Sequence, residues 1–364
     1  GGGGLPPARE VMYTNDVVEF NARNRNRIPL SEKQSLEFGW NFTYESTNFV
    51  EDSLELNLQN TSGRSDRIGL FVQDEIRPAK WLSIRPGLRL DYPFHLDRVY
   101  VQPRMQLELD LAERWRLNAA AGMYTQFISE TSVMDELGNI NYFWAISDNA
   151  DVPVLSSNHF VGGLTFNHKG FTIGAEGYYK TTSGISRSVY LWKEDIQTVY
   201  QGDARMYGMD LLVKQYFRKH EAWASYTLSK TEEHFPYMSE EVDYRAAPQD
   251  QRHELKGALL LNFNPFFIST NYVYGSGFRE PESLFEETEE GERYPYSRLD
   301  VSLIYRLSIK NTHFEVGISI LNVLDHENVK YSNVVRIPNS QTTNVSINAE
   351  AVPFTPTLYL NMAF

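Results

Sequence analysis

The sequence lacks cysteine altogether, and no stretch of it approaches about 18 consecutive apolar residues. The missing apolar run excludes a membrane protein that crosses the bilayer with helices. The missing cysteines fit an oxidising compartment, in which a stray thiol is a liability. Basic residues are also scarce, with 34 Lys and Arg against 47 Asp and Glu and a net charge of −13. This balance argues against nucleic acid as a partner, because phosphate binding needs a basic surface.

Signatures of catalysis are missing too. The chain contains no nucleophile elbow, no phosphate-binding glycine loop and no His-anchored triad, so we expect no enzyme and no cofactor. His234 and His253, with Glu233 and Asp243 nearby, suggest a metal or haem site, but their separation matches no ligand motif. The carboxylates of 282–292 could bind Ca²⁺, yet they lack the spacing of a calcium loop. A solvated loop that binds divalent ions loosely is the favoured interpretation, and we expect no metal site.

Aromatic residues, in contrast, are abundant: 22 Tyr, 21 Phe and 6 Trp suit the aromatic girdles of a membrane-spanning barrel. Apolar and polar residues alternate with a period of two, as at 36–44 and 101–111. This pattern predicts an all-β fold, a transmembrane antiparallel β-barrel with about 15 strands in this chain. Strand cores are predicted at 15–27, 35–46, 65–77, 81–92, 99–111, 115–127, 157–167, 171–182, 205–217, 221–231, 251–263, 266–276, 294–308, 312–323 and 352–364.

The connections between these strands alternate strictly between short and long. Tight turns are predicted at 77–80, 112–114, 167–170, 218–220, 264–265 and 308–311. Between them lie long polar segments at 46–64, 128–156, 183–204, 232–250, 277–293 and 324–351, with 93–98 as a short member of that set. Outer-membrane barrels sort their periplasmic turns and extracellular loops in this way, whereas a soluble sandwich has no reason to do so. The chain also ends on an apolar row that closes with Phe364, as expected of a C-terminal insertion signal.

Charged residues inside the predicted strands fall on the row opposite the apolar one. An Arg or Lys that faced lipid at mid-depth would cost about 2–4 kcal/mol, so this row must face a hydrated or protein-filled lumen. Mixed signs predict cross-strand ion pairs there. The predicted lumen-facing residues are Arg85, Arg89, Arg104, Glu108, Glu176, Asp210, Lys256, Asp300 and Arg306.

Two long loops carry aromatic residues that could contact a ligand. Phe143 and Trp144 lie in the segment 128–156, and Tyr190 and Trp192 lie in 183–204. Aromatic side chains above a lumen supply contact area at low entropic cost. Loop packing or a girdle role explains them equally well, so both interpretations stay open.

Eight short segments stand in a fixed order along the chain. They are LFVQDE at 70–75, LSIRPGLRLD at 82–91, QPR at 102–104, EGYYK at 176–180, SYTLSK at 225–230, DQRH at 250–253, YGSG at 274–277 and LNVLD at 321–325. Together they resemble the C-terminal barrel of TonB-dependent outer-membrane transporters, in the form common among Bacteroidota. The resemblance implies a barrel of about 22 strands with a globular plug inside. The chain would supply the last fifteen or so strands, without the plug.

The resemblance also implies an organisation and a set of partners. We expect residues 1–8 to be a linker or placeholder and 9–364 to be the barrel portion, recorded incompletely or split from a longer receptor. The implied function is TonB-energised uptake of a ligand into the periplasm from the cell outer membrane. Implied partners are the TonB–ExbB–ExbD complex through the plug, lipopolysaccharide and other outer-membrane lipid, the barrel assembly machinery and a surface lipoprotein. The alternative is a structural or docking barrel that anchors a multi-protein surface complex without transport, while an open porin would need an even strand count.

Overall fold

A computed structural model describes residues 11–53, 56–134, 140–191, 196–237, 244–278, 293–309, 312–336 and 344–363. Every regular element within them is a β-strand. None of the described residues belongs to a helix long and apolar enough to cross a membrane. Residues 1–8, Trp192, the carboxylates of 282–292 and Phe364 lie outside the described residues.

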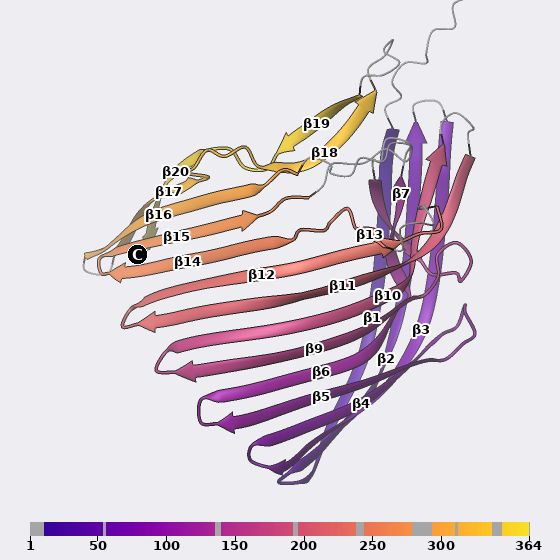
Figure 1. Ribbon diagram of the computed structural model, residues 1–364, viewed down its shortest axis with the longest axis horizontal. Coiled ribbons are helices and arrows are strands. Elements are labelled where there is room, and N and C mark those ends of the chain that lie inside the picture. Colours follow the sequence, from indigo (N-terminus) through magenta and orange to yellow (C-terminus); the bar gives the residue numbers. More distant parts are fainter. Residues whose placement is uncertain are drawn as a thin grey trace, which may run out of the picture.

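One antiparallel sheet forms the body of the molecule, and it curls along its length (Figure 1). Fifteen long strands follow one another in chain order, and each coincides with one of the predicted strands. They are β1 (Val11–Ser31), β2 (Gln34–Ser53), β3 (Leu56–Ala79), β4 (Leu82–Pro93), β5 (Tyr100–Ala112), β6 (Trp115–Gln126), β9 (Leu155–His168), β10 (Phe171–Leu191), β11 (Ile196–Phe217), β12 (His220–His234), β14 (His253–Phe263), β15 (Phe266–Gly275), β16 (Tyr296–Ile309), β17 (Thr312–Leu321) and β20 (Thr355–Ala363).

Tight connections join neighbouring strands at one end of the sheet, here named the turn end. They occupy 32–33, 80–81, 113–114, 169–170, 218–219 and 264–265. At Lys169 and Gly170 the φ angles are 46° and 80°, the left-handed values of a type I′ turn, whose twist matches that of the flanking strands. The longer connections lie at the opposite, loop end. The predicted alternation of short and long connections is therefore confirmed except between β2 and β3 and between β10 and β11, where two and four residues separate the strands.

Two of the predicted loops are wrong, because they are strands. The β2–β3 ladder continues through 46–64 until Ser53 pairs with Leu56. The β10–β11 ladder continues through 183–204 until Leu191 pairs with Ile196. The polar composition of these segments indicates only that their side chains leave an apolar environment. The backbone hydrogen bonds between the two strands can continue beyond that point. Short strands also occupy other long connections, namely β7 (Ile128–Met134), β8 (Ile140–Ile146), β13 (Arg245–Ala246), β18 (Val329–Arg336) and β19 (Asn344–Glu350).

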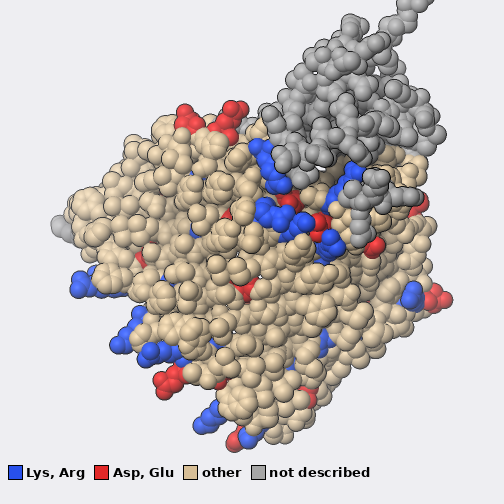
Figure 2. Space-filling view, viewed as in Figure 1, with Lys and Arg blue, Asp and Glu red and all other residues tan. Residues whose placement is uncertain are grey.

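The pairing register gives the sheet an apolar face and a polar face. All nine charged residues predicted to share one row lie on the polar face; Glu176, for example, pairs with Asp210 and Arg85 with Gln106. The apolar face carries exposed large side chains such as Leu70, and Figure 2 shows a broad area of the sheet with charge gathered mainly towards its rims. Near the C-terminus Leu358, Leu360 and Met362 continue the apolar face.

Candidate functional site

A hairpin formed by β7 and β8 crosses the polar side of the sheet at the loop end. Residues 132–134 of β7 pair in parallel with 187–189 of β10. On β8, Phe143 stacks on Phe49 of β2 with ring centroids 4.0 Å apart. Because β4, β5, β6 and β9 separate β3 from β10 in the sheet, the hairpin bridges strands that are not neighbours. It therefore spans part of the mouth formed by the curled sheet.

Packing holds the β8 side of this hairpin against β1, β2 and β3. Phe143 is 6% exposed and belongs to a small buried cluster with Phe49. Gly63 makes the close approach possible, since a Cβ there would lie 2.7 Å from the Cβ of Ile146. The side chain of Asn15 caps the contact: its Oδ1 accepts a hydrogen bond from the Trp144 backbone N–H at 2.8 Å. The burial of Phe143 favours loop packing for that residue, whereas Trp144 is 40% exposed.

A buried ion pair holds the β7 side. Arg187 on β10 donates to both oxygens of Glu233 on β12, at 2.7 and 3.0 Å, and both side chains are 7% exposed. Arg187 also donates to the Ser132 hydroxyl at 3.2 Å and to the Tyr237 hydroxyl at 2.9 Å. Its guanidinium lies 4.5 Å from the ring centre of Phe235. One side chain thus joins β7, β10, β12 and the connection after β12.

Burial also acts on Tyr237, which lies outside the strands. It raises the pKa of the phenol above its ordinary value, although the positive charge of Arg187 opposes the shift. Tyr237 therefore stays neutral near pH 7 and accepts the hydrogen bond from Arg187.

Beneath the hairpin, the polar face of β2, β3 and β4 carries a network of charged side chains. Arg67 donates to both oxygens of Glu45 at 3.3 Å. Arg89 donates to Asp91 and to the Asn41 amide oxygen, each at 2.7 Å. These bonds satisfy carboxylates that are almost fully buried, which would otherwise be costly.

Arg104 differs from Arg67 and Arg89, because it has no carboxylate partner among the described residues. Its guanidinium lies 4.7 Å from the ring centre of Tyr124 and 3.4 Å from the amide oxygen of Gln102. Its Nε is buried without a hydrogen bond. Arg104 lies at a hollow of about 240 Å³ on the polar face. The hollow is lined by neutral residues and by five charged ones, namely Arg23, Arg25, Glu37, Arg89 and Arg104.

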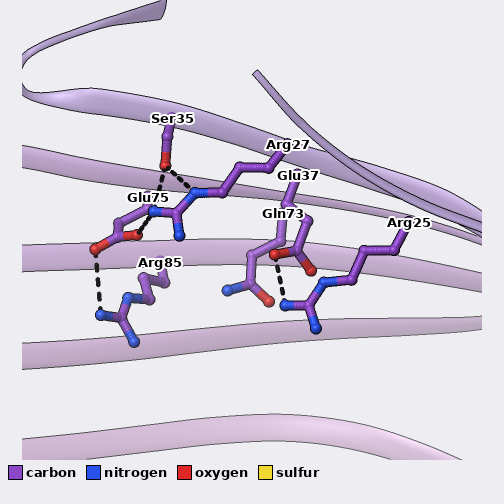
Figure 3. Close-up of a pocket in the computed structure, with 7 residues that line it drawn as sticks. All are labelled: Arg25, Arg27, Ser35, Glu37, Gln73, Glu75 and Arg85. Carbon is purple, nitrogen blue, oxygen red and sulfur yellow. Dashed lines mark hydrogen bonds and ion pairs between the residues drawn. The ribbon is translucent and has the colours of Figure 1, made fainter. Parts of the chain in front are cut away.

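A second arginine cluster lies on the same face towards the turn end (Figure 3). Glu75 of β3 binds Arg27 at 2.7 Å, Arg85 at 3.2 Å and Arg77 at 2.5 Å. Figure 3 shows Arg25 meeting Glu37 beside it, at 2.6 Å. Three arginines share Glu75 and the fourth binds Glu37, so every arginine of this cluster has a carboxylate partner. These ion pairs tie β1, β2, β3 and β4 together.

The charged residues predicted from alternation do not gather in one site, because they extend from β4 to β16. Seven of them have partners on the polar face. Arg85–Glu75 and Arg89–Asp91 are described above, and the other pairs are Lys256–Glu254 at 2.6 Å, Asp300–Arg298 at 2.8 Å, Arg306–Glu315 at 2.6 Å, Glu108–Arg116 at 3.5 Å and Asp210–Thr227 at 2.6 Å. Cross-strand partners thus occur as expected, while some pairs join residues two apart on one strand. The lumen-facing role of the row stays a prediction.

Two of the four aromatic residues predicted to contact a ligand have side chains within the described part of the structure. Phe143 and Trp144 alternate on β8, one buried and one exposed. Tyr190 belongs to β10, but its side chain, like all of Trp192, lies outside the described residues. The possible metal ligands are apart: the His234 ring lies beside Tyr244, and the His253 ring nitrogen meets the Tyr226 hydroxyl at 2.7 Å. No group of three or more metal-binding side chains occurs in the described part of the chain.

Sequence reasoning missed Arg187. The reason is a register shift between Ser183 and Ile185, where Gly184 has a φ of 85°. Before the shift the even-numbered residues Glu176 and Lys180 lie on the polar face of β10, and after it the odd-numbered Arg187 lies on that face. A glycine that interrupts an alternating segment was the available signal.

Comparison with known proteins agrees with this architecture. Residues 2–323 match the family model described as "TonB dependent receptor-like, beta-barrel". The chain belongs to the TonB-dependent receptor family. β-Barrels of this family are outer-membrane proteins, and its members are receptors of transport systems, not enzymes. No curated protein matches the chain.

Solved structures of TonB-dependent receptors share the fold. A variant of the ferric enterobactin receptor PfeA from Pseudomonas aeruginosa is 15% identical with a TM-score of 0.64, over 96% of this chain and 54% of that one. The ferric citrate transporter FecA is 10% identical with a TM-score of 0.64, over 97% and 54% of the two chains. The copper transporter OprC is 14% identical with a TM-score of 0.62, over 88% and 53%. The chain thus spans about half the length of these proteins, and identities this low carry the fold alone.

Proposed function

We propose that this chain forms one wall of an outer-membrane barrel that takes a ligand into the periplasm with energy from TonB. The observation that supports this most is the arginine-rich hollow on the polar face, beneath a hairpin that crosses the mouth. In this proposal the polar face lines the lumen, and Trp144, Tyr190 and Trp192 contact the ligand at the loop end. Phe143 holds the hairpin in position.

The charge of the hollow favours an anionic ligand. Arg25 binds Glu37 and Arg89 binds Asp91, whereas Arg23 and Arg104 have no carboxylate partner among the described residues. The buried Nε of Arg104 makes no hydrogen bond. A desolvated guanidinium binds carboxylate and phosphate oxygens strongly. The related structures include receptors for ferric enterobactin and ferric citrate. An anionic metal chelate is therefore the ligand class that we propose.

The partners and the narrower classification stay predictions. Energy would come from TonB–ExbB–ExbD through a plug, and insertion would depend on the barrel assembly machinery. Outer-membrane lipid and a surface lipoprotein would contact the outside and the mouth. The matches support the family as a whole and do not support the Bacteroidota form.

Uptake by cells tests the proposal. Radioactive iron is supplied as ferric citrate and as ferric catecholate, and copper as its citrate complex, to the parent strain and to strains lacking either this gene or TonB. At least one chelate should enter the parent strain only. Unchanged uptake of all three chelates in both deletion strains would contradict the proposal and favour the docking barrel.

Replacing Arg104 with glutamine in the full-length gene product should weaken binding of that chelate by about tenfold to a hundredfold, because a hydrogen bond to a charged group is lost. Equilibrium binding to purified protein measures the effect. Lys256→Gln is the matched control, since Lys256 lies on the same face but is paired with Glu254. Equal losses in the two variants would show that the hollow around Arg104 has no special role.

A further inference from the structure

The apolar face has a hollow of about 580 Å³ across β6, β9 and β10. Its floor is formed by paired small residues, because Ala119 pairs with Gly162 and Gly162 with Gly177. A Cβ added at Gly162 would meet nothing within 4 Å, so the floor is open. Phe160 and Tyr179 form its border on the side of the loop end. On a face that otherwise bears large side chains, this shape accommodates a narrow apolar chain.

Two cations lie on the same face beside this hollow. Arg205 Nε binds Glu232 at 2.8 Å, and Lys230 binds the same carboxylate at 2.5 Å. Glu232 is buried beneath them at 5% side-chain exposure, whereas the cations are 36% and 31% exposed. The ring of Tyr244 supports Arg205 from 4.1 Å. The buried carboxylate orients both cations outward and leaves the trio with one net positive charge.

The pairing register of β10, β11 and β12 shows how far the two cations lie from the hollow. Tyr179, at the border of the hollow, pairs with Tyr207, and Tyr207 pairs with Lys230. Lys230 thus lies in the same row as Tyr179, two strand spacings away, which is about 10 Å. Lys230 is ten residues from His220 at the turn end. Ten residues span about 33 Å along a strand, which is about 23 Å along the membrane normal when the strand is tilted by 45°. This height is close to that of the apolar band of a membrane barrel, about 25 Å.

We propose that a phosphorylated lipid of the outer leaflet binds at this place. Its phosphate contacts Arg205 and Lys230 at the membrane boundary, and one of its acyl chains fills the hollow at Gly162. Charge complementarity selects this occupant over a second copy of the chain, which would bring the same cations to the contact. The inference depends on the membrane position of the family and not on uptake, so either can fail without the other.

Lipid retention measures this binding. The full-length gene product is reconstituted in nanodiscs of phosphatidylcholine that contain diphosphoryl lipid A, and retained lipid is counted by native mass spectrometry after transfer to detergent. The triple variant Arg205→Gln, Lys230→Gln, Glu232→Gln removes both cations without leaving a buried unpaired carboxylate. It should retain lipid A about tenfold less than the wild type, given the contribution expected of two basic residues near a membrane surface. Dephosphorylated lipid A should bind the wild type equally weakly.

A second pair of variants tests the hollow separately. Gly162→Leu should fill the hollow and reduce retention severalfold. Gly257→Leu is the matched control, because Gly257 lies on the apolar face of β14 and its added Cβ would meet only an ordinary contact at 3.4 Å. Wild-type retention by the triple variant, or equal retention by the two leucine variants, would overturn the proposal, as would a dimer that forms without bound lipid.

Discussion

Replacing Arg187 with methionine should release the β7 side of the hairpin from β10 and β12. The change leaves Glu233 as a buried charge without its partner, and breaking such a pair costs about 3–5 kcal/mol. Ser132 and Tyr237 lose a hydrogen bond at the same time. Hydrogen exchange at the amides of 132–134 should therefore accelerate by about two to three orders of magnitude. The turn end, which lies far from Arg187, should exchange as before.

A matched exposed pair provides the control. Arg64 and Asp66 are 3.1 Å apart, but their side chains are 66% and 32% exposed. Arg64→Met should change local stability by less than about 1 kcal/mol. The double variant Arg187→Met, Glu233→Leu should recover much of the lost protection, because no unpaired charge is left. Equal exchange at β7 in Arg187→Met and in the wild type would show that the hairpin is held by the β8 side alone.

Introducing arginine at position 211 should impair barrel assembly, whereas arginine at position 212 should be tolerated. The two leucines are neighbours on β11 with nearly equal exposure, 37% and 39%. Leu211 pairs with Ala175 on the apolar face, and Leu212 shares the polar face with Asp210. An arginine facing lipid near the midplane costs about 2–4 kcal/mol. Unfolding from lipid vesicles by urea measures the difference.

The comparison between the two arginine variants distinguishes a lipid-facing side chain from a lumen-facing one. We expect Leu211→Arg to lower the free energy of unfolding by at least about 2 kcal/mol more than Leu212→Arg does. Local strain or lost packing would affect both variants alike, since they carry the same substitution. Equal destabilisation by the two would mean that the faces of β11 meet similar surroundings.

The strands were predictable because one physical constraint acts along each of them. A row that faces hydrocarbon must be apolar, and its opposite row is free to carry charge, so Leu107 and Glu108 fall on different faces. The turn end was predictable as well, since a two-residue connection such as Lys169-Gly170 has its own turn chemistry. These signals are local, so a single sequence contains them.

The arrangement at the loop end was not predictable, because there the decisive contacts are distant in sequence. Alternation places Arg89 on the polar face but does not reveal that it binds Asn41, 48 residues away. Likewise nothing local indicates that Phe143 stacks on Phe49. Outside the apolar band the constraint of lipid disappears, so a strand that continues, as β2 does to Ser53, resembles a loop in composition.

We expect this sheet to cross a membrane with one face towards lipid, and labelling of β5 tests this orientation directly. Because the chain has no cysteine, single cysteines can be introduced one at a time without competing thiols in it. A fluorophore attached at 105 or 107 should be quenched by a lipid-soluble quencher, and one at 106 by a water-soluble quencher, since Met105 and Leu107 lie on the apolar face and Gln106 on the polar face. Equal quenching at the three positions by the lipid-soluble reagent would contradict this orientation of the sheet.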